Sequence, residues 1–104
     1  MMKITSMEKI IIGELTIDPE RFLVYRNDRA ISLTKTEFYI LYLLMSNYGK
    51  IHSREFIHQF VLGKENLGSP RTIDVHISNI RKKIGRVNEK DVITVIRGVG
   101  YKLN

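Results

Sequence analysis

Cysteine is missing from this sequence of 104 residues, and no part of it stays apolar over a long distance. Without cysteine, disulfides and thiolate metal sites are excluded, which suits a reducing cytosol. The longest apolar segment, residues 38–45, is far shorter than the roughly 20 residues that cross a membrane. The chain does not open with the basic and apolar segment of a secreted protein. These absences predict a cytoplasmic protein with no membrane partner.

Patterns that carry catalysis or hold metals are also absent. The spacing of His52, His58 and His76 does not place them on one helix face as a metal site. No serine lies in a glycine-flanked nucleophile elbow. Gly98 and Gly100 precede no predicted helix, so they do not form a dinucleotide-binding loop. We therefore expect no catalytic residue, no bound metal and no cofactor.

What the chain does contain is positive charge on an ordinary globular composition. Hydrophobic residues make up 43% and charged residues 27%, which fits one small domain with a modest core. The formal net charge is +6 at pH 7, and the isoelectric point is about 9.7. Such a balance predicts a polyanionic partner, with nucleic acid favoured over an anionic membrane surface.

Residues 69–86 hold the strongest pattern in the chain. Isoleucines recur there at spacings that place them on one stripe of a helix from about residue 70 to residue 85, namely Ile73, Ile77, Ile80 and Ile84. Five Lys or Arg against one Asp leave this segment with a charge of +4. A helix that is apolar on one side and basic and polar on the other suits the major groove of DNA. Ser69 is expected to cap this helix, with Pro70 at its first position.

The segment before this helix predicts a small antiparallel sheet. Residues 10–17 read as one strand that stops at Asp18-Pro19, and residues 22–25 and 30–33 flank a hairpin turn at Asn27-Asp28. Residues 1–9 show no period and are expected to be a linker or a frayed terminus, which leaves residues 10–104 as the domain.

Two further helices and a terminal hairpin complete the predicted order. Thr34 and Glu37 form a capping box at the start of a helix that closes near Gly49. Ser53 is expected to cap the second helix. Its predicted inward side chains are Phe56, Ile57, Phe60 and Val61. After the third helix, residues 92–96 are β-branched and are expected to pair with residues 101–103.

Four motifs in this order resemble the C-terminal DNA-binding (effector) domain of OmpR/PhoB-type response regulators, and the likeness extends from about residue 10 to residue 103. The motifs are Leu33-Thr34-x-Thr36-Glu37-Phe38, Ser53-Arg54-Glu55, Arg71-Thr72-Ile73-Asp74-Val75-His76-Ile77-x-x-Ile80-Arg81-Lys82-Lys83 and Ile96-Arg97-Gly98-Val99-Gly100-Tyr101. The resemblance implies an α+β fold: a winged helix-turn-helix with an N-terminal antiparallel β-sheet, three helices and a C-terminal β-hairpin wing. It also implies sequence-specific binding of double-stranded DNA and transcriptional regulation in a bacterial two-component system.

The resemblance further implies the partners of such a domain. A phosphoacceptor receiver domain, missing from this chain, would precede it; a stand-alone regulator is the alternative. Two copies would bind head to tail on direct repeats of DNA. RNA polymerase would be contacted by the loop between the second and third helices, which here includes Gly63, Lys64, Glu65, Asn66, Leu67 and Gly68.

Two positions depart from the family pattern and affect the expected target. Leu62 stands where relatives often have a tryptophan that touches the sugar-phosphate backbone, so that contact is in doubt. Ser78 and Asn79 stand where some members carry two arginines. The target sequence therefore cannot be copied from a relative.

The polar face of the third helix supplies the candidate base-reading residues. Asn79 is placed to bond an adenine through two hydrogen bonds, a contact worth about 1–3 kcal/mol of discrimination. Val75 suits contact with a thymine methyl group. The equal alternative is that Val75 is an aliphatic surface residue with no ligand. Ser78 lies beside them and is assigned to base reading as well.

Other polar residues of this helix are expected to position the domain on the DNA backbone. Arg71, Thr72 and Lys82 are assigned to phosphates or to base edges at the groove walls. His76 is a phosphate contact by resemblance, whereas its place on the helical wheel equally allows a half-buried histidine. Arg81 is either a phosphate contact or an intramolecular partner.

The terminal hairpin supplies the remaining candidates. Arg97 precedes a tight glycine turn, so its side chain is expected at the hairpin tip, where arginine can enter an A·T-rich minor groove. The resemblance adds Tyr101 to the DNA-contacting residues. The competing hypothesis is a winged-helix module for protein or non-specific RNA contacts, which would place apolar anchors on the outer face of the third helix.

Overall fold

The computed structural model describes residues 8–62, 69–87 and 89–104. Within them the chain forms a four-stranded antiparallel sheet, three helices and a two-stranded hairpin, so the predicted α+β winged-helix architecture is confirmed. In chain order the elements are β1 (Ile10–Ile12), β2 (Leu15–Asp18), β3 (Leu23–Arg26), β4 (Arg29–Ala30), α1 (Lys35–Ser46), α2 (Arg54–Leu62), α3 (Thr72–Ile84), β5 (Ile93–Ile96) and β6 (Gly100–Leu103). None of the helices in these ranges is long and apolar enough to cross a membrane.

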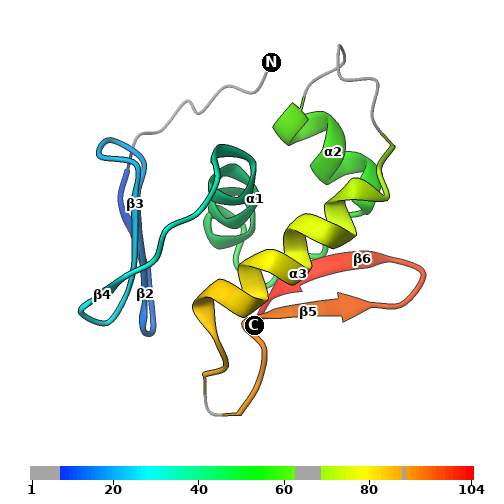
Figure 1. Ribbon diagram of the computed structural model, residues 1–104. Coiled ribbons are helices and arrows are strands. Elements are labelled where there is room, and N and C mark those ends of the chain that lie inside the picture. The colour runs from blue at the N-terminus through cyan, green and yellow to red at the C-terminus, as the bar shows by residue number, and fades with distance from the viewer. Residues whose placement is uncertain (1–7, 63–68, 88) are drawn as a thin grey trace.

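The N-terminal sheet runs in the order β1-β2-β3-β4 and lies on the side of α1 opposite to the C-terminal hairpin (Figure 1). The single strand predicted over residues 10–17 is wrong, because Gly13 adopts a φ of 57° and turns the chain back between β1 and β2. The turn at Asn27-Asp28 is confirmed, with Asn27 at a φ of 52° between paired Arg26 and Arg29.

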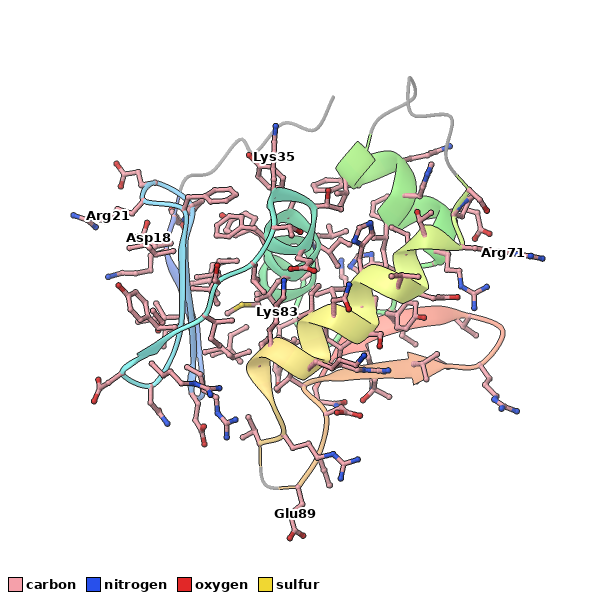
Figure 2. All side chains as sticks on the ribbon, viewed as in Figure 1. Asp18, Arg21, Lys35, Arg71, Lys83 and Glu89 are labelled. Atoms are coloured by element: carbon pink, nitrogen blue, oxygen red, sulfur yellow. The ribbon has the colours of Figure 1, made fainter. Side chains whose placement is uncertain are left out.

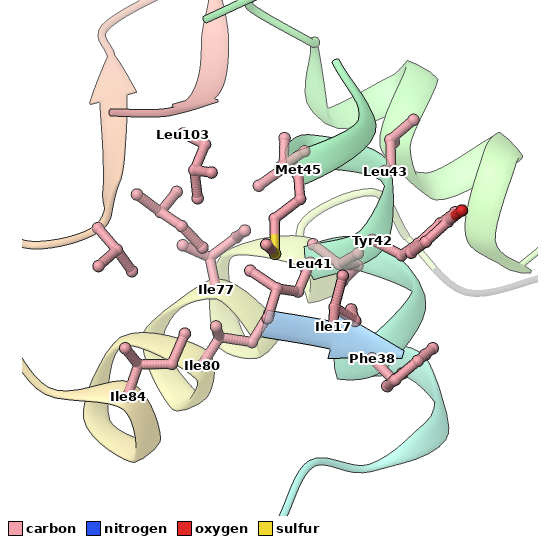
Figure 3. Packing of buried hydrophobic residues seen from close by; sticks show 14 of the residues in the cluster. Ile17, Phe38, Leu41, Tyr42, Leu43, Met45, Ile77, Ile80, Ile84 and Leu103 are labelled. Atoms are coloured by element: carbon pink, nitrogen blue, oxygen red, sulfur yellow. The ribbon is translucent and has the colours of Figure 1, made fainter. Parts of the chain in front are cut away.

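The first helix begins at the predicted capping box. The backbone N–H of Glu37 donates to Thr34 Oγ1 at 3.2 Å, and the backbone N–H of Thr34 donates to Glu37 Oε1 at 2.9 Å. Behind this cap α1 is buried along most of its length, and Figure 3 shows Phe38, Leu41 and Met45 within the core. The helix therefore forms the centre against which the other elements pack.

In the second helix the predicted cap by Ser53 is confirmed, and one of the four predicted inward side chains is exposed instead. The hydroxyl of Ser53 accepts from the backbone N–H of Phe56 at 3.0 Å. Ile57 and Val61, four residues apart, are buried as predicted. Phe56 is 46% exposed instead, because the apolar stripe of this short helix is centred on those two residues. Its ring stacks on His52 at the surface, with 5.3 Å between the ring centroids.

The third helix buries its isoleucine stripe. All four isoleucines, Ile73, Ile77, Ile80 and Ile84, are at most 1% exposed, and Figure 3 shows three of them facing the core beside α1. The helix begins at Thr72, two residues later than the predicted start at Pro70. Before it the backbone makes a tighter turn, in which the N–H of Thr72 donates to the Ser69 carbonyl at 3.0 Å. The predicted cap by Ser69 is wrong: Arg71 is the N-cap residue and has no side-chain cap bond, and Ser69 Oγ accepts from the N–H of Arg71 at 3.2 Å within the preceding turn.

The carboxyl end of α3 is tied to the N-terminal half of the chain. The guanidinium groups of Arg26 and Arg29 donate to the carbonyl of Ile84 at 3.0 and 3.1 Å. Lys83 Nζ lies 2.6 Å from Glu37 Oε1. Positive groups stabilise this end of a helix, where the carbonyls lack helical partners. The sheet and α1 therefore set the direction in which α3 points.

Acid is expected to weaken the link between Glu37 and Lys83. Burial opposes ionisation of Glu37, but its hydrogen bonds with Lys83 and Thr34 and the charge of Lys83 hold the pKa of its carboxyl below the ordinary 4.5. This stabilisation is complete above the unfolded-state pKa of 4.5 and is lost as the pH falls through the lower folded-state pKa. Glu37→Gln should cost about 1 kcal/mol at pH 7 and flatten the loss of stability below pH 4.5.

Urea unfolding of both proteins at pH 7 and at several acidic pH values measures this difference. Lys35→Gln, at an exposed position in the first turn of the same helix, is the control. A Glu37→Gln protein that loses stability toward acid as steeply as the natural chain would contradict the assignment.

Candidate nucleic-acid interface

The outer side of α3 lies away from the isoleucine stripe and carries most of the predicted contact residues. Val75 is 60% exposed, Ser78 and Lys82 are exposed, and Asn79 is half-buried. Arg71, exposed in the turn before α3, projects away from the body of the domain (Figure 2). One continuous surface therefore combines positive charge, hydrogen-bonding side chains and a single aliphatic group.

The β5–β6 hairpin forms a wing beside α3 (Figure 1). Ile96 pairs with Gly100, and the turn between them carries the exposed side chains of Arg97 and Val99. Near its turn, the outer edge of β6 is bonded to the link before α2: the N–H of His52 donates to the Tyr101 carbonyl at 2.8 Å, and the N–H of Tyr101 donates to the His52 carbonyl at 2.9 Å. The predicted position of Arg97 at the hairpin tip is confirmed.

The structure favours the intramolecular alternative for Arg81. Its Nε and Nη2 atoms donate to the carbonyl of Ile93 at 3.0 and 2.8 Å, which joins α3 to the start of the wing. The hydroxyl of Thr72 donates to the Ser69 carbonyl at 2.9 Å, so its proton already has an acceptor. His76 is half-buried, as both of its alternatives allow.

Tyr101, which the resemblance adds to the DNA-contacting residues, is largely buried in this structure. Tyr101 is 5% exposed, and its hydroxyl donates to Asp74 Oδ1. A side chain this deeply buried offers little surface to a ligand. Its neighbour Gly100 explains the close packing, because the backbone of β6 at this point lies directly against His52.

Sequence reasoning missed the part played by Arg54 and Asp74. Arg54 Nε lies 2.7 Å from Asp74 Oδ1, which links the first residue of α2 to the first turn of α3. The two residues are 20 positions apart, so no local pattern joins them. The predicted polymerase loop, residues 63–68, lies outside the described residues. Among the described residues, no group of three His, Cys, Asp or Glu side chains could hold a metal ion.

The chain is similar in sequence to known transcriptional regulatory proteins. The model of the family described as transcriptional regulatory protein, C terminal, matches residues 28–103. The chain is 38% identical over 91 residues to the phosphate regulon transcriptional regulatory protein PhoB of Rhizobium meliloti, a match that covers 88% of this chain and 40% of that protein. The chain thus spans less than half the length of this relative.

Two solved structures share the fold of the chain. Response regulator DrrB, an OmpR/PhoB homologue from Thermotoga maritima, superposes with a TM-score of 0.80 at 38% identity, over 91% of this chain and 43% of that one. The RstA DNA-binding domain of Klebsiella pneumoniae, solved in complex with the RstA box, superposes with a TM-score of 0.80 at 31% identity, over 92% of this chain and 96% of that one.

Proposed function

We propose a DNA-docking mode on the premise that this chain belongs to the transcriptional regulatory protein C-terminal family, of the OmpR/PhoB response-regulator type. The chain is thus a DNA-binding domain that regulates transcription as the output part of such a regulator. In the proposed mode α3 enters the major groove of duplex DNA, and the wing lies at the adjacent minor groove.

One observation carries this proposal: the exposed polar face of α3 and the exposed Arg97 belong to neighbouring elements, which the bonds from Arg81 to the Ile93 carbonyl join. A major groove about 12 Å wide admits an α-helix, while the narrower minor groove admits an extended arginine. The outer face of α3 lacks the row of apolar anchors that a protein-binding module would need; among its described residues only Val75 is a large exposed hydrophobic.

Within this mode the contacts divide into two kinds. Arg71 and Lys82 position the domain on phosphates, which carry charge and no sequence information. Val75, Ser78 and Asn79 face the base edges, and Asn79 offers the donor and acceptor pair that matches adenine. Arg97 reads the width and potential of the minor groove.

The proposal extends to the partners of the whole protein. The chain covers 40% of the PhoB relative, which leaves room there for a second domain; we assign that role to a receiver domain. Two copies bind head to tail on direct repeats, and residues 63–68 contact RNA polymerase. The protein acts in the bacterial cytoplasm, where the duplex target lies, and no catalytic step is part of this function.

Removing the wing arginine is expected to weaken binding across sequences. Arg97→Ala should lower affinity for a selected duplex about fivefold and reduce the slope of log affinity against log salt by about 1, since one cationic contact is lost. Fluorescence anisotropy over a salt series measures both quantities. Lys35→Ala is the matched control, because Lys35 is exposed on the end of α1 away from the wing (Figure 2). An unchanged salt slope for Arg97→Ala would remove the wing from the interface.

A further inference from the structure

Three elements meet at the carboxylate of Asp74. Arg54 at the start of α2 and Tyr101 in β6 both donate to Asp74 Oδ1 in the first turn of α3. The separations along the chain are 20 and 27 residues, so the contacts exist only because the fold brings the elements together. Besides the backbone pairing with His52 and the bonds from Arg81 to the Ile93 carbonyl, the Tyr101 hydroxyl gives the wing a further attachment to α3, at its first turn.

Asp74 places a negative charge in the first turn of the helix that is proposed to face DNA. A free carboxylate there would repel phosphates, and its favourable interaction with the helix N-terminus is small, about 0.3–1 kcal/mol. Arg54 neutralises this charge at 2.7 Å. Burial opposes ionisation of Asp74, but the hydrogen bonds from Tyr101 and Arg54 and the charge of Arg54 hold the pKa of the carboxyl below its ordinary value. The carboxylate therefore stays a charged acceptor throughout the range in which DNA binds.

The ion pair within the cluster contributes little to overall stability. The Arg54 and Asp74 side chains are 48% and 39% exposed, and ion pairs this accessible to solvent contribute little to folding. The hydroxyl of Tyr101 points at an acceptor on another element, while its ring is packed in the core. The cluster thus fixes one point of β6 against the first turn of α3.

A two-stranded hairpin such as the wing is only marginally stable by itself. Tyr101 pairs with Val95, next to the Ile96–Gly100 pair that precedes the turn, and Arg97 lies in that turn, so a rotation of this end of the hairpin displaces the guanidinium. Two contacts that form in one binding step give a higher affinity when the groups that make them are already held in place, because less conformational freedom is lost on binding.

We propose that Asp74 is a positioning residue that joins the wing to α3 through the Tyr101 hydroxyl, so that one rigid unit meets the major and the minor groove. Arg54 completes the unit by neutralising Asp74 and fixing its orientation. This inference rests on the proposed docking of α3 and the wing, and it gives Tyr101 an indirect part in DNA binding.

Tyr101→Phe tests the link, because it removes the hydroxyl and keeps the buried ring. In the natural background it should weaken binding to a selected duplex about fivefold, and in an Arg97→Ala background by less than about twofold, since the contact it positions is already gone. Tyr25→Phe, a half-buried tyrosine in the N-terminal sheet, is the control and should leave binding unchanged in both backgrounds.

Amide hydrogen exchange without DNA gives a readout independent of the docking mode. Tyr101→Phe should speed exchange at β5 and β6 amides about threefold or more while the amides of β2 and β3 keep their rates. Equal weakening in the two backgrounds, or unchanged exchange in the wing, overturns the positioning role. Faster wing exchange together with an Arg97→Ala protein that binds normally would instead refute the wing contact and leave the Asp74 link intact.

Discussion

Replacing Gly100 with alanine is expected to disrupt the pairing of β6 with the link before α2 and to destabilise the domain by about 3 kcal/mol or more. A Cβ atom at this position would lie 2.0 Å from the carbonyl oxygen of His52, 2.6 Å from its carbonyl carbon and 2.9 Å from Ser53 Cα. All three are backbone atoms, so no side chain can swing aside. The two hydrogen bonds between His52 and Tyr101 hold the strands at this separation, and both would have to lengthen or break.

Gly98→Ala is the matched control for this experiment. Gly98 has a φ of 75°, but nothing lies within 4 Å of an added Cβ. Its replacement should therefore cost only the conformational penalty of about 1–2 kcal/mol. Urea unfolding of the two variants and the natural chain provides the comparison, with the larger loss expected for Gly100→Ala. Equal losses would show that the close approach of β6 to His52 does not stabilise the wing.

Replacing Asn79 with alanine is expected to weaken binding to the target duplex while binding to a scrambled duplex is nearly unchanged. A bidentate amide–adenine contact contributes about 1–3 kcal/mol to the preference for the right base, which corresponds to a drop of about 5- to 150-fold in the ratio of target to scrambled binding. Phosphate contacts from Arg71 and Lys82 would persist, so binding to the scrambled duplex should change little.

The measurement is a competition between target and scrambled duplexes for the natural chain and for Asn79→Ala. Gln59→Ala is the control, because Gln59 presents an exposed amide on α2, outside the proposed reading face. Thermal unfolding of each variant checks that the half-buried Asn79 can be replaced without loss of the fold. An unchanged ratio for Asn79→Ala would exclude direct readout by this residue.

The features that the sequence predicts correctly are local ones. The four isoleucines of α3 reveal their common face through the helical period alone, and the capping box needs only Thr34 and Glu37, three residues apart. The exposed position of Arg97 follows from the turn that surrounds it. For these features, neighbours along the chain determine the structure.

Features that depend on distant parts of the chain could not be predicted. The bonds of Arg81 to Ile93 and of Tyr101 to Asp74 join residues 12 and 27 positions apart, and no periodicity encodes them. The sequence also predicts Phe56 on the inner face, because a short helix gives too few turns to separate its apolar stripe from an adjacent exposed aromatic residue.

Methylation protection tests the docking mode most directly, because dimethyl sulfate reacts with guanine N7 in the major groove and with adenine N3 in the minor groove. On a duplex selected from a random pool, the natural chain should protect guanine N7 atoms in one segment and adenine N3 atoms in the flanking segment. Arg97→Ala should lose only the adenine protection. Adenine protection that survives in Arg97→Ala, or guanine N7 atoms that stay reactive throughout the footprint, would contradict the placement of α3 and the wing.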